Sequence, residues 1–112
     1  MAEFSARVSA DEERLWMYLL FYEGECFKTA RGLEFTYTVK GNEIFVSRKD
    51  KSITRSTINA AYRRAKEILA AGGTVDGPKK LGTFGASYLY PIFQHIGVIP
   101  FVEKPVQLKM KI

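Results

Sequence analysis

The segment from Leu33 to Val46 constrains the fold most, because its apolar residues alternate on both sides of a central two-residue turn. Alternation with a period of two is typical of strands that bury one face. Gly41-Asn42 has the composition of a tight hairpin turn. The segment therefore predicts an antiparallel hairpin in which Val39 lies opposite Ile44 and Tyr37 lies opposite Val46.

A helix with a clear start follows this hairpin. Thr54 is a suitable N-cap, and Ile53 and Ile58 occupy the two positions of a hydrophobic staple around it. Apolar residues then recur at helical spacing as far as Leu69, and Gly72-Gly73 provides the stop. The opposite face carries arginine, lysine and asparagine, so the pattern predicts a helix with one buried face and one basic face.

Three further elements complete the expected chain. Ser9 and Glu12 fit a capping box that begins a first helix over residues 10–23. The apolar residues of this helix occupy more than one face, which predicts a central position in the core. A short helix is expected over residues 88–96, and the alternation over residues 106–112 predicts a third strand.

These elements predict an α+β fold built as a small single domain over residues 1–112. The expected order is helix, β-hairpin, helix, short helix and strand, with a three-stranded antiparallel sheet packed on the helices. A winged-helix-like arrangement is the alternative. A chain of 112 residues with 46% hydrophobic residues is long enough and apolar enough to bury one core, so disorder over most of it is not expected.

Charge and apolar runs limit the classes of partner. With 17 Lys and Arg against 12 Asp and Glu, the chain carries a formal charge of +5, which suits a nucleic acid, an acidic protein or an anionic membrane. The longest apolar run, over residues 15–22, is much shorter than the ~20 residues that span a membrane. The N-terminus lacks the apolar segment of a signal peptide. We therefore expect a cytoplasmic protein without a membrane partner.

Basic residues gather in three stretches: the turn after the hairpin, the outer face of the second helix, and a glycine-rich loop. Arginine and lysine side chains one helical turn apart can straddle a phosphate backbone, and asparagine can reach a base edge. A helix N-terminus also attracts anions. The candidate nucleic-acid-binding residues are Arg48, Lys49, Lys51, Thr54, Arg55, Asn59, Arg63, Lys66, Lys79 and Lys80.

The segment from Ile53 to Tyr62 resembles the recognition half of a helix-turn-helix motif. It has an apolar residue, a threonine cap, and then a threonine and a branched apolar residue before the next core position. The complete motif requires a preceding helix joined by a tight turn. Residues 43–48 fit a strand better, and only a short helix capped by Asn42 in their place would restore the motif.

No catalytic signature is present. His95 is the only histidine, and no serine or cysteine has an obvious base partner. Cys26 is the only cysteine, which excludes an intrachain disulfide, and we expect it to be a small buried apolar residue. The prediction is therefore a protein without enzyme activity, cofactor or metal. A cluster of carboxylates formed by folding would instead favour a metal-dependent nuclease.

Two functional hypotheses follow. The first is a non-enzymatic protein that binds DNA or RNA, using the basic helix face and the adjacent basic turn to contact the phosphate backbone. The second is a small protein-interaction module or inhibitor, of a mobile-element or phage type. It would bind an acidic surface of a larger nucleic-acid-processing enzyme, through Phe45, the aromatic region around Tyr88 and a free sheet edge. A homodimer formed through a sheet edge is a further alternative.

Overall fold

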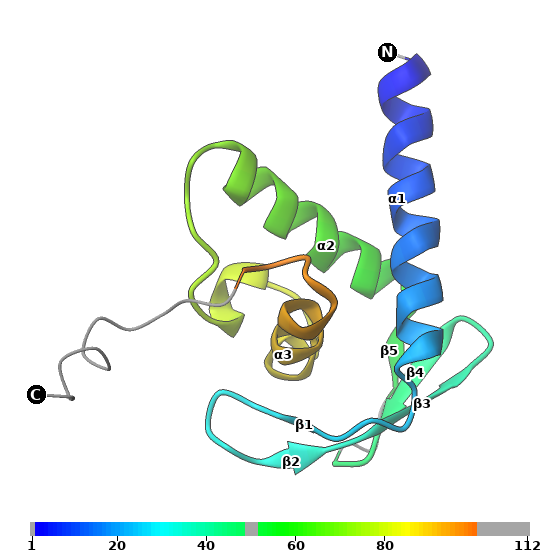
Figure 1. Ribbon diagram of the computed structural model, residues 1–112, viewed down its shortest axis with the longest axis vertical. Helices are drawn as coiled ribbons and strands as arrows, with labels where there is room; N and C mark the ends of the chain where they lie inside the picture. Colours follow the sequence, from blue (N-terminus) through cyan, green and yellow to red (C-terminus); the bar gives the residue numbers. More distant parts are fainter. Residues whose placement is uncertain (1, 49–51, 101–112) are drawn as a thin grey trace, which may run out of the picture.

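The computed structural model describes residues 2–48 and 52–100, with side chains described from residue 11 onward. It has the expected α+β composition, with three α-helices, one 3₁₀ helix and five short strands in this part of the chain (Figure 1). The elements are α1 (Ala2–Phe21), β1 (Phe27–Lys28), β2 (Glu34–Phe35), β3 (Tyr37–Lys40), β4 (Glu43–Val46), β5 (Ile53–Thr54), α2 (Arg55–Ala70), η1 (Pro78–Leu81) and α3 (Ala86–Ile96).

The predicted hairpin is confirmed in its register. Strands β3 and β4 pair antiparallel with Val39 opposite Ile44 and Tyr37 opposite Val46. The three-stranded antiparallel sheet is also confirmed, but its third strand is β5, which pairs with β4. The strand expected over residues 106–112 lies outside the described residues. Strand β5 could not be predicted from alternating apolar residues because it is only two residues long.

The strand expected from residue 33 to 40 is divided at Thr36. The Thr36 backbone N–H donates to the hydroxyl of Ser47 at 3.0 Å instead of to a backbone carbonyl. Strand β2, before this point, pairs with β1 in a separate two-stranded sheet. On the outer edge of β3, the Val39 N–H donates to the Glu23 carboxylate at 2.9 Å, and Gly24 N–H donates to the Tyr37 carbonyl at 3.1 Å. This stretch of edge is therefore covered by the segment that follows α1.

Helix α2 begins as predicted. The Thr54 hydroxyl accepts a hydrogen bond from the Thr57 N–H at 3.3 Å, which satisfies one of the free donors at the helix start. The buried stripe is Ile58, Ala61, Tyr62 and Ala65. Because β5 joins α2 directly and pairs with β4, the helix that a helix-turn-helix motif needs before α2 is not formed. The resemblance to that motif, and the winged-helix alternative with it, therefore do not hold.

Helix α1 is longer than predicted and lies at the side of the molecule. It begins at Ala2, so the capping box expected at Ser9 is wrong. Residues 2–9 include alanine, glutamate and arginine and contain no glycine or proline, so the helix continues towards the N-terminus. In Figure 1 the N-terminal half of α1 extends past every other labelled element. The expectation of a central core helix is also wrong, since only one side of α1 is buried.

One core unites the elements. Leu15, Trp16 and Leu19 of α1 pack into the same buried cluster as residues of β1–β5, α2 and α3. The phenol of Tyr37, itself 1% exposed, donates to the Leu19 carbonyl at 2.5 Å and so ties the sheet to α1.

Helix α3 begins at Ala86, two residues before the expected start at residue 88. Its N-cap is Gly85, which has a φ of +75° and makes no side-chain capping bond. A Cβ atom on Gly85 would lie 2.4 Å from the Ile53 Cδ1 atom, so the close approach of α3 to β5 requires glycine here.

Candidate interaction surfaces

Arg55, the first residue of α2, is held by α1 and by the hairpin turn. Its guanidinium forms an ion pair with Glu13 at 3.1 Å and lies 4.9 Å from the centroid of the Trp16 ring. It also donates to the side-chain oxygen of Asn42 at 3.4 Å. With 24% of its side chain exposed, Arg55 already has the charge, stacking and hydrogen-bond partners that a phosphate and a base would supply.

Arg63 is paired still more closely with α1. Its Nε and Nη2 atoms donate to the two carboxylate oxygens of Glu12 at 2.5 and 3.1 Å. Glu12 is 9% exposed, and it is the one buried charged residue in the described part of the chain. The hydrogen bond and the negative charge of Glu12 raise the pKa of Arg63 above its usual range. The two arginines at the centre of the expected basic face are therefore neutralised within the chain.

Thr54 and Lys66 of this face also have local roles. Thr54 caps α2. Lys66 places its ammonium group 5.8 Å from the centroid of the Tyr62 ring. Asn59 is half-buried, and its side-chain oxygen is buried without a hydrogen-bond partner among the described residues. Arg64 lies on the other flank of the helix, towards η1. The expected basic stripe is thus divided between two neighbours of α2.

The basic turn after β4 is described only in part. Arg48 is exposed and has no hydrogen bond or ion pair to the residues described. Lys49 and Lys51 lie outside the described residues. The contribution of this turn to a basic surface therefore stays a prediction.

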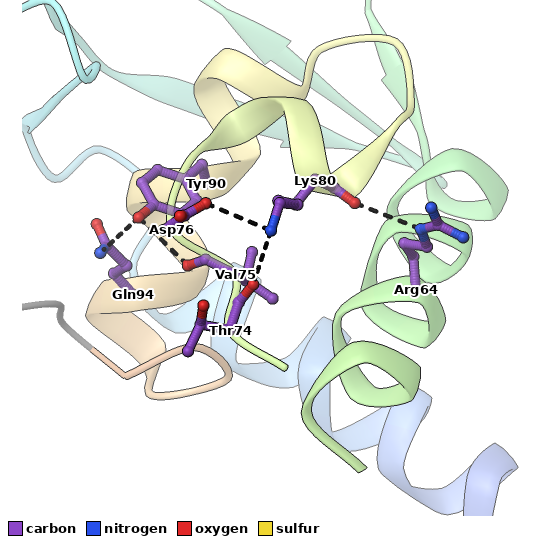
Figure 2. Close-up of polar contacts among 7 residues, drawn as sticks. All are labelled: Arg64, Thr74, Val75, Asp76, Lys80, Tyr90 and Gln94. Carbon is purple, nitrogen blue, oxygen red and sulfur yellow. Dashed lines mark hydrogen bonds and ion pairs between the residues drawn. The ribbon is translucent and has the colours of Figure 1, made fainter. Parts of the chain in front are cut away.

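The glycine-rich loop meets α2 at η1 (Figure 2). The Arg64 Nε atom donates to the Lys80 carbonyl at 3.4 Å. The Lys80 ammonium donates to the Thr74 carbonyl at 3.2 Å and lies 3.6 Å from the Asp76 carboxylate. Two of the three predicted basic stretches therefore touch, but Lys80 is used to fold the loop. Lys79 is exposed; its backbone carbonyl accepts a hydrogen bond from the Gly82 N–H, and its ammonium group makes no hydrogen bond or ion pair with any described residue.

The same loop is tied to α3. The Tyr90 hydroxyl lies 3.5 Å from the Val75 carbonyl and accepts a hydrogen bond from the Gln94 amide at 3.3 Å (Figure 2). Burial, and then the charge of Asp76, raise the pKa of Tyr90 above its ordinary value. The phenol therefore stays neutral and holds the loop against the core.

An open pocket of about 430 Å³ lies where α2 begins, beside the hairpin turn. It is lined by Asn42, Glu43, Thr54, Arg55, Ser56 and Asn59. Its two charged residues already have partners, since Arg55 binds Glu13 and the Glu43 carboxylate accepts a hydrogen bond from Ser52. The pocket therefore presents no unpaired charge to a ligand.

The strongest surface feature is apolar, and sequence reasoning missed it. Met17, Tyr18, Leu20 and Phe21 of α1 are 66%, 45%, 46% and 75% exposed. If each large side chain has an area of about 200 Å², this α1 apolar surface exposes roughly 450 Å². An apolar patch of this size is often functional in a monomeric protein. The signal was available in the sequence, because a helix that is apolar on two sides needs two partners.

Ring contacts join the α1 apolar surface to the core. The Phe21 and Tyr22 rings meet edge to face with centroids 4.9 Å apart, and Tyr22 meets His95 of α3 at 4.6 Å. His95 in turn lies 5.3 Å from Phe27. His95 is exposed but contacts two aromatic rings, and Phe21 contacts Tyr22 although most of its side chain is exposed.

The aromatic residues predicted for a protein interface behave differently from one another. Phe45 is 39% exposed on β4, and the Lys40 ammonium lies 6.0 Å from the centroid of its ring. Tyr88 is partly buried and packs edge to face on Phe35 at 5.0 Å. Tyr88 therefore packs against the core, while Phe45 and, in the same region as Tyr88, Phe84 (46% exposed) lie at the surface.

Metal-ligating clusters and membrane-spanning helices are both absent from the described residues. Within residues 2–48 and 52–100, no three His, Cys, Asp or Glu side chains are grouped so that they could hold a metal ion. No helix in this part of the chain has both the length and the apolar character needed to cross a membrane. Cys26 is exposed, which corrects the expectation of a buried thiol: it precedes the two-residue strand β1, whose inward position is taken by Phe27.

The chain was compared with known proteins. No protein-family model matches it, and neither the curated proteins nor the solved structures contain a significant match.

Proposed function

We propose that this protein is a non-enzymatic interaction module that binds another protein chain through the α1 apolar surface. One observation carries the proposal: one side of α1 lies in the core, while four large apolar side chains on the rest of the helix are exposed. Aromatic and methionine side chains are enriched at protein interfaces, and three of these four residues belong to those types.

The charge arrangement favours this function over binding through the basic face of α2. A phosphate backbone would have to compete with Glu13 for Arg55 and with Glu12 for Arg63. Releasing Glu12 would also leave a buried carboxylate without a partner, which is costly. Protein binding at the α1 apolar surface requires neither change.

The test compares two exposed phenylalanines. Immobilised chain is incubated with a host lysate treated with nuclease, in parallel with Phe21→Glu and Phe45→Glu variants. We expect Phe21→Glu to reduce capture of bound protein by at least about tenfold, because a charge replaces a central apolar contact. Phe45→Glu should leave that capture unchanged. Equal capture by the wild type and the Phe21→Glu variant would overturn the proposal.

Nucleic-acid binding is the second candidate function, and the junction of α2 with η1 favours it. Arg64 lies against the Lys80 backbone there, and Lys79 is next to it along the chain. Because the Lys80 ammonium is paired with Asp76, Arg64 and Lys79 are the two cations available there; if they contact about two phosphates, log affinity for duplex DNA should fall against log salt concentration with a slope near −1.8.

Fluorescence anisotropy with a labelled duplex, repeated at several salt concentrations, tests this function separately. Lys79→Glu should weaken binding and reduce the salt slope by about one. Phe21→Glu should leave the slope unchanged, since residue 21 is not among the residues that would contact a phosphate. A wild-type chain with no salt-sensitive binding to DNA or RNA would rule the second function out.

A further inference from the structure

Two neighbouring carboxylates of α1 cover the basic face of α2. Glu13 pairs with Arg55 at 3.1 Å, and both carboxylate oxygens of Glu12 accept hydrogen bonds from Arg63. The two arginines are eight positions apart on α2, which separates them by about 12 Å along the helix axis. One small anion cannot reach both of them. The face therefore fits a row of anionic groups, and α1 itself supplies two.

Both arginines keep capacity that α1 does not use. Arg63 bonds Glu12 through Nε and Nη2 only, and its side chain is 56% exposed, whereas an arginine carries five N–H donors. Arg55 lines the open pocket at the start of α2, together with the hydroxyl-bearing Thr54 and Ser56. The first turn of α2 contains no acidic residue, so the negative charge that a helix start favours comes from other elements.

We infer that α1 is an autoinhibitory cover of a nucleic-acid-binding face on α2, with Glu12 and Glu13 lying where two backbone phosphates would otherwise bind. Arginine forms the same charge-assisted hydrogen bonds with carboxylate and with phosphate. A competitor tethered in the same chain acts at a high effective concentration, so a ligand that displaces it needs densely spaced charges. Duplex DNA, with one charge per ~1.7 Å of its axis, has that density. The exposed side of α1, which carries the proposed function, takes no part in this contact.

The two carboxylates hold their arginines unequally. The Glu13 side chain is 72% exposed and can turn to solvent without disturbing the core. Glu12 is 9% exposed and loses a buried partner when Arg63 leaves. Arg55 is therefore the first contact that a phosphate would gain, although the Glu43 carboxylate in the same pocket opposes an anion there. The face is thus closed in the wild type and opens when the α1 carboxylates lose their charge.

Duplex DNA binding by a chain whose α1 carboxylates have lost their charge tests the cover. Every chain in the comparison carries Lys79→Glu, which weakens binding at the junction of α2 with η1. The α1 variant then combines Glu12→Gln with Glu13→Gln. It should bind a labelled duplex at least about tenfold more tightly than its parent. Its salt slope should be steeper by up to about 1.8, because two phosphate contacts are added. Arg55→Gln and Arg63→Gln, introduced together, should abolish both gains.

A control variant separates this effect from net charge. It combines Glu25→Gln with Glu34→Gln, which makes the same change in net charge at two exposed carboxylates outside α1 and α2. Its salt slope should equal that of the parent, because no phosphate contact is added. Glu13→Gln alone provides a second measurement should the α1 variant not fold, since this side chain is mostly exposed. It should tighten binding about two- to fivefold.

Two results would overturn the cover. The first is equal affinity and equal salt slope of the α1 variant and the control variant, or of Glu13→Gln and its parent where the α1 variant does not fold. The second is tighter binding of poly-glutamate than of DNA by the α1 variant, which would assign the face to an acidic protein. Neither result bears on the proposed function, which is decided by capture through Phe21.

Discussion

The two sides of α1 have similar residues and opposite surroundings. Leu15, Trp16 and Leu19 are at most 7% exposed, while Leu20 is 46% exposed and Phe21 is 75% exposed. The polar residues follow the same division, since Glu12 is buried against Arg63 and Arg14 points to solvent. One helix therefore serves both the core and an open surface. Apolar composition alone does not predict which side of α1 is buried in the core and which is exposed, because burial depends on what the rest of the chain can cover.

The neighbouring leucines of α1 give the largest expected difference. Leu19→Ala should lower the free energy of unfolding by about 2–5 kcal/mol, because it removes a fully buried side chain and leaves a cavity. Leu20→Ala should change it by less than about 0.5 kcal/mol. Urea denaturation of both variants measures the two values. Similar losses for the two variants would show that the exposed side of α1 also stabilises the monomer.

The two sides of α1 also show which features of the fold can be predicted from the sequence. The register of β3 and β4 follows from alternation and a two-residue turn, both of which are local, and Thr54 is recognisable as a cap for the same reason. Which side of α1 stays exposed cannot be predicted from the local sequence. The helix is apolar on two sides, and only the assembled fold shows that one of them is left uncovered.

The prediction of the basic site was wrong for the same reason, because it depended on ion pairs between residues far apart in the sequence. Arg55 and Arg63 read as a basic stripe because their spacing on α2 is visible in the sequence. Their partners, Glu13 and Glu12, are 42 and 51 residues away. A cationic face on one helix therefore predicts a polyanion partner only when no other element brings carboxylates to it.

The ion pairs of α1 give the next largest difference. Arg63→Met should cost about 1–2 kcal/mol of unfolding free energy, because it leaves the buried Glu12 carboxylate without its partner, although solvent at the half-exposed arginine limits the loss. Arg14→Met should cost less than about 0.3 kcal/mol, since its ion pair with Asp11 is long and exposed. A double variant with Glu12→Met and Arg63→Met should recover part of the loss. Equal effects of the two single substitutions would contradict this account of Arg63.

The buried side of α1 should also show at alkaline pH, through the Tyr37 phenol beneath it. Burial, followed by the charges of Glu23 and Glu25, raises the pKa of this phenol above its ordinary value. Below about pH 10 it is neutral in both the folded and unfolded chain. Above that, the unfolded chain releases the proton and the folded chain does not. The free energy of unfolding should therefore fall by up to about 1.4 kcal/mol for each further pH unit.

Tyr37→Phe isolates this contribution. The variant should be less stable by about 1 kcal/mol near neutral pH, because the Leu19 carbonyl loses its hydrogen bond. Above pH 10 the unfolding free energy of the variant should decline less steeply with pH than that of the wild type. The two slopes should differ by up to about 1.4 kcal/mol per pH unit, which corresponds to one proton. The alkaline slope is obtained from denaturation curves measured between about pH 9 and 11. An unchanged slope would mean that Tyr37 ionises as readily in the folded chain as in the unfolded one.

The exposed side of α1 should have the smallest effect on the monomer and a distinct dependence on concentration. Met17→Gln should leave the unfolding free energy of dilute chain within about 0.5 kcal/mol of wild type, because its side chain is 66% exposed. If association through α1 stabilises the folded state, the wild-type Tm should rise by about 3 °C for each tenfold increase in concentration. Met17→Gln should reduce that rise, while Phe45→Gln should keep it. A wild-type Tm that does not depend on concentration would show that the exposed side of α1 does not stabilise the folded state through association.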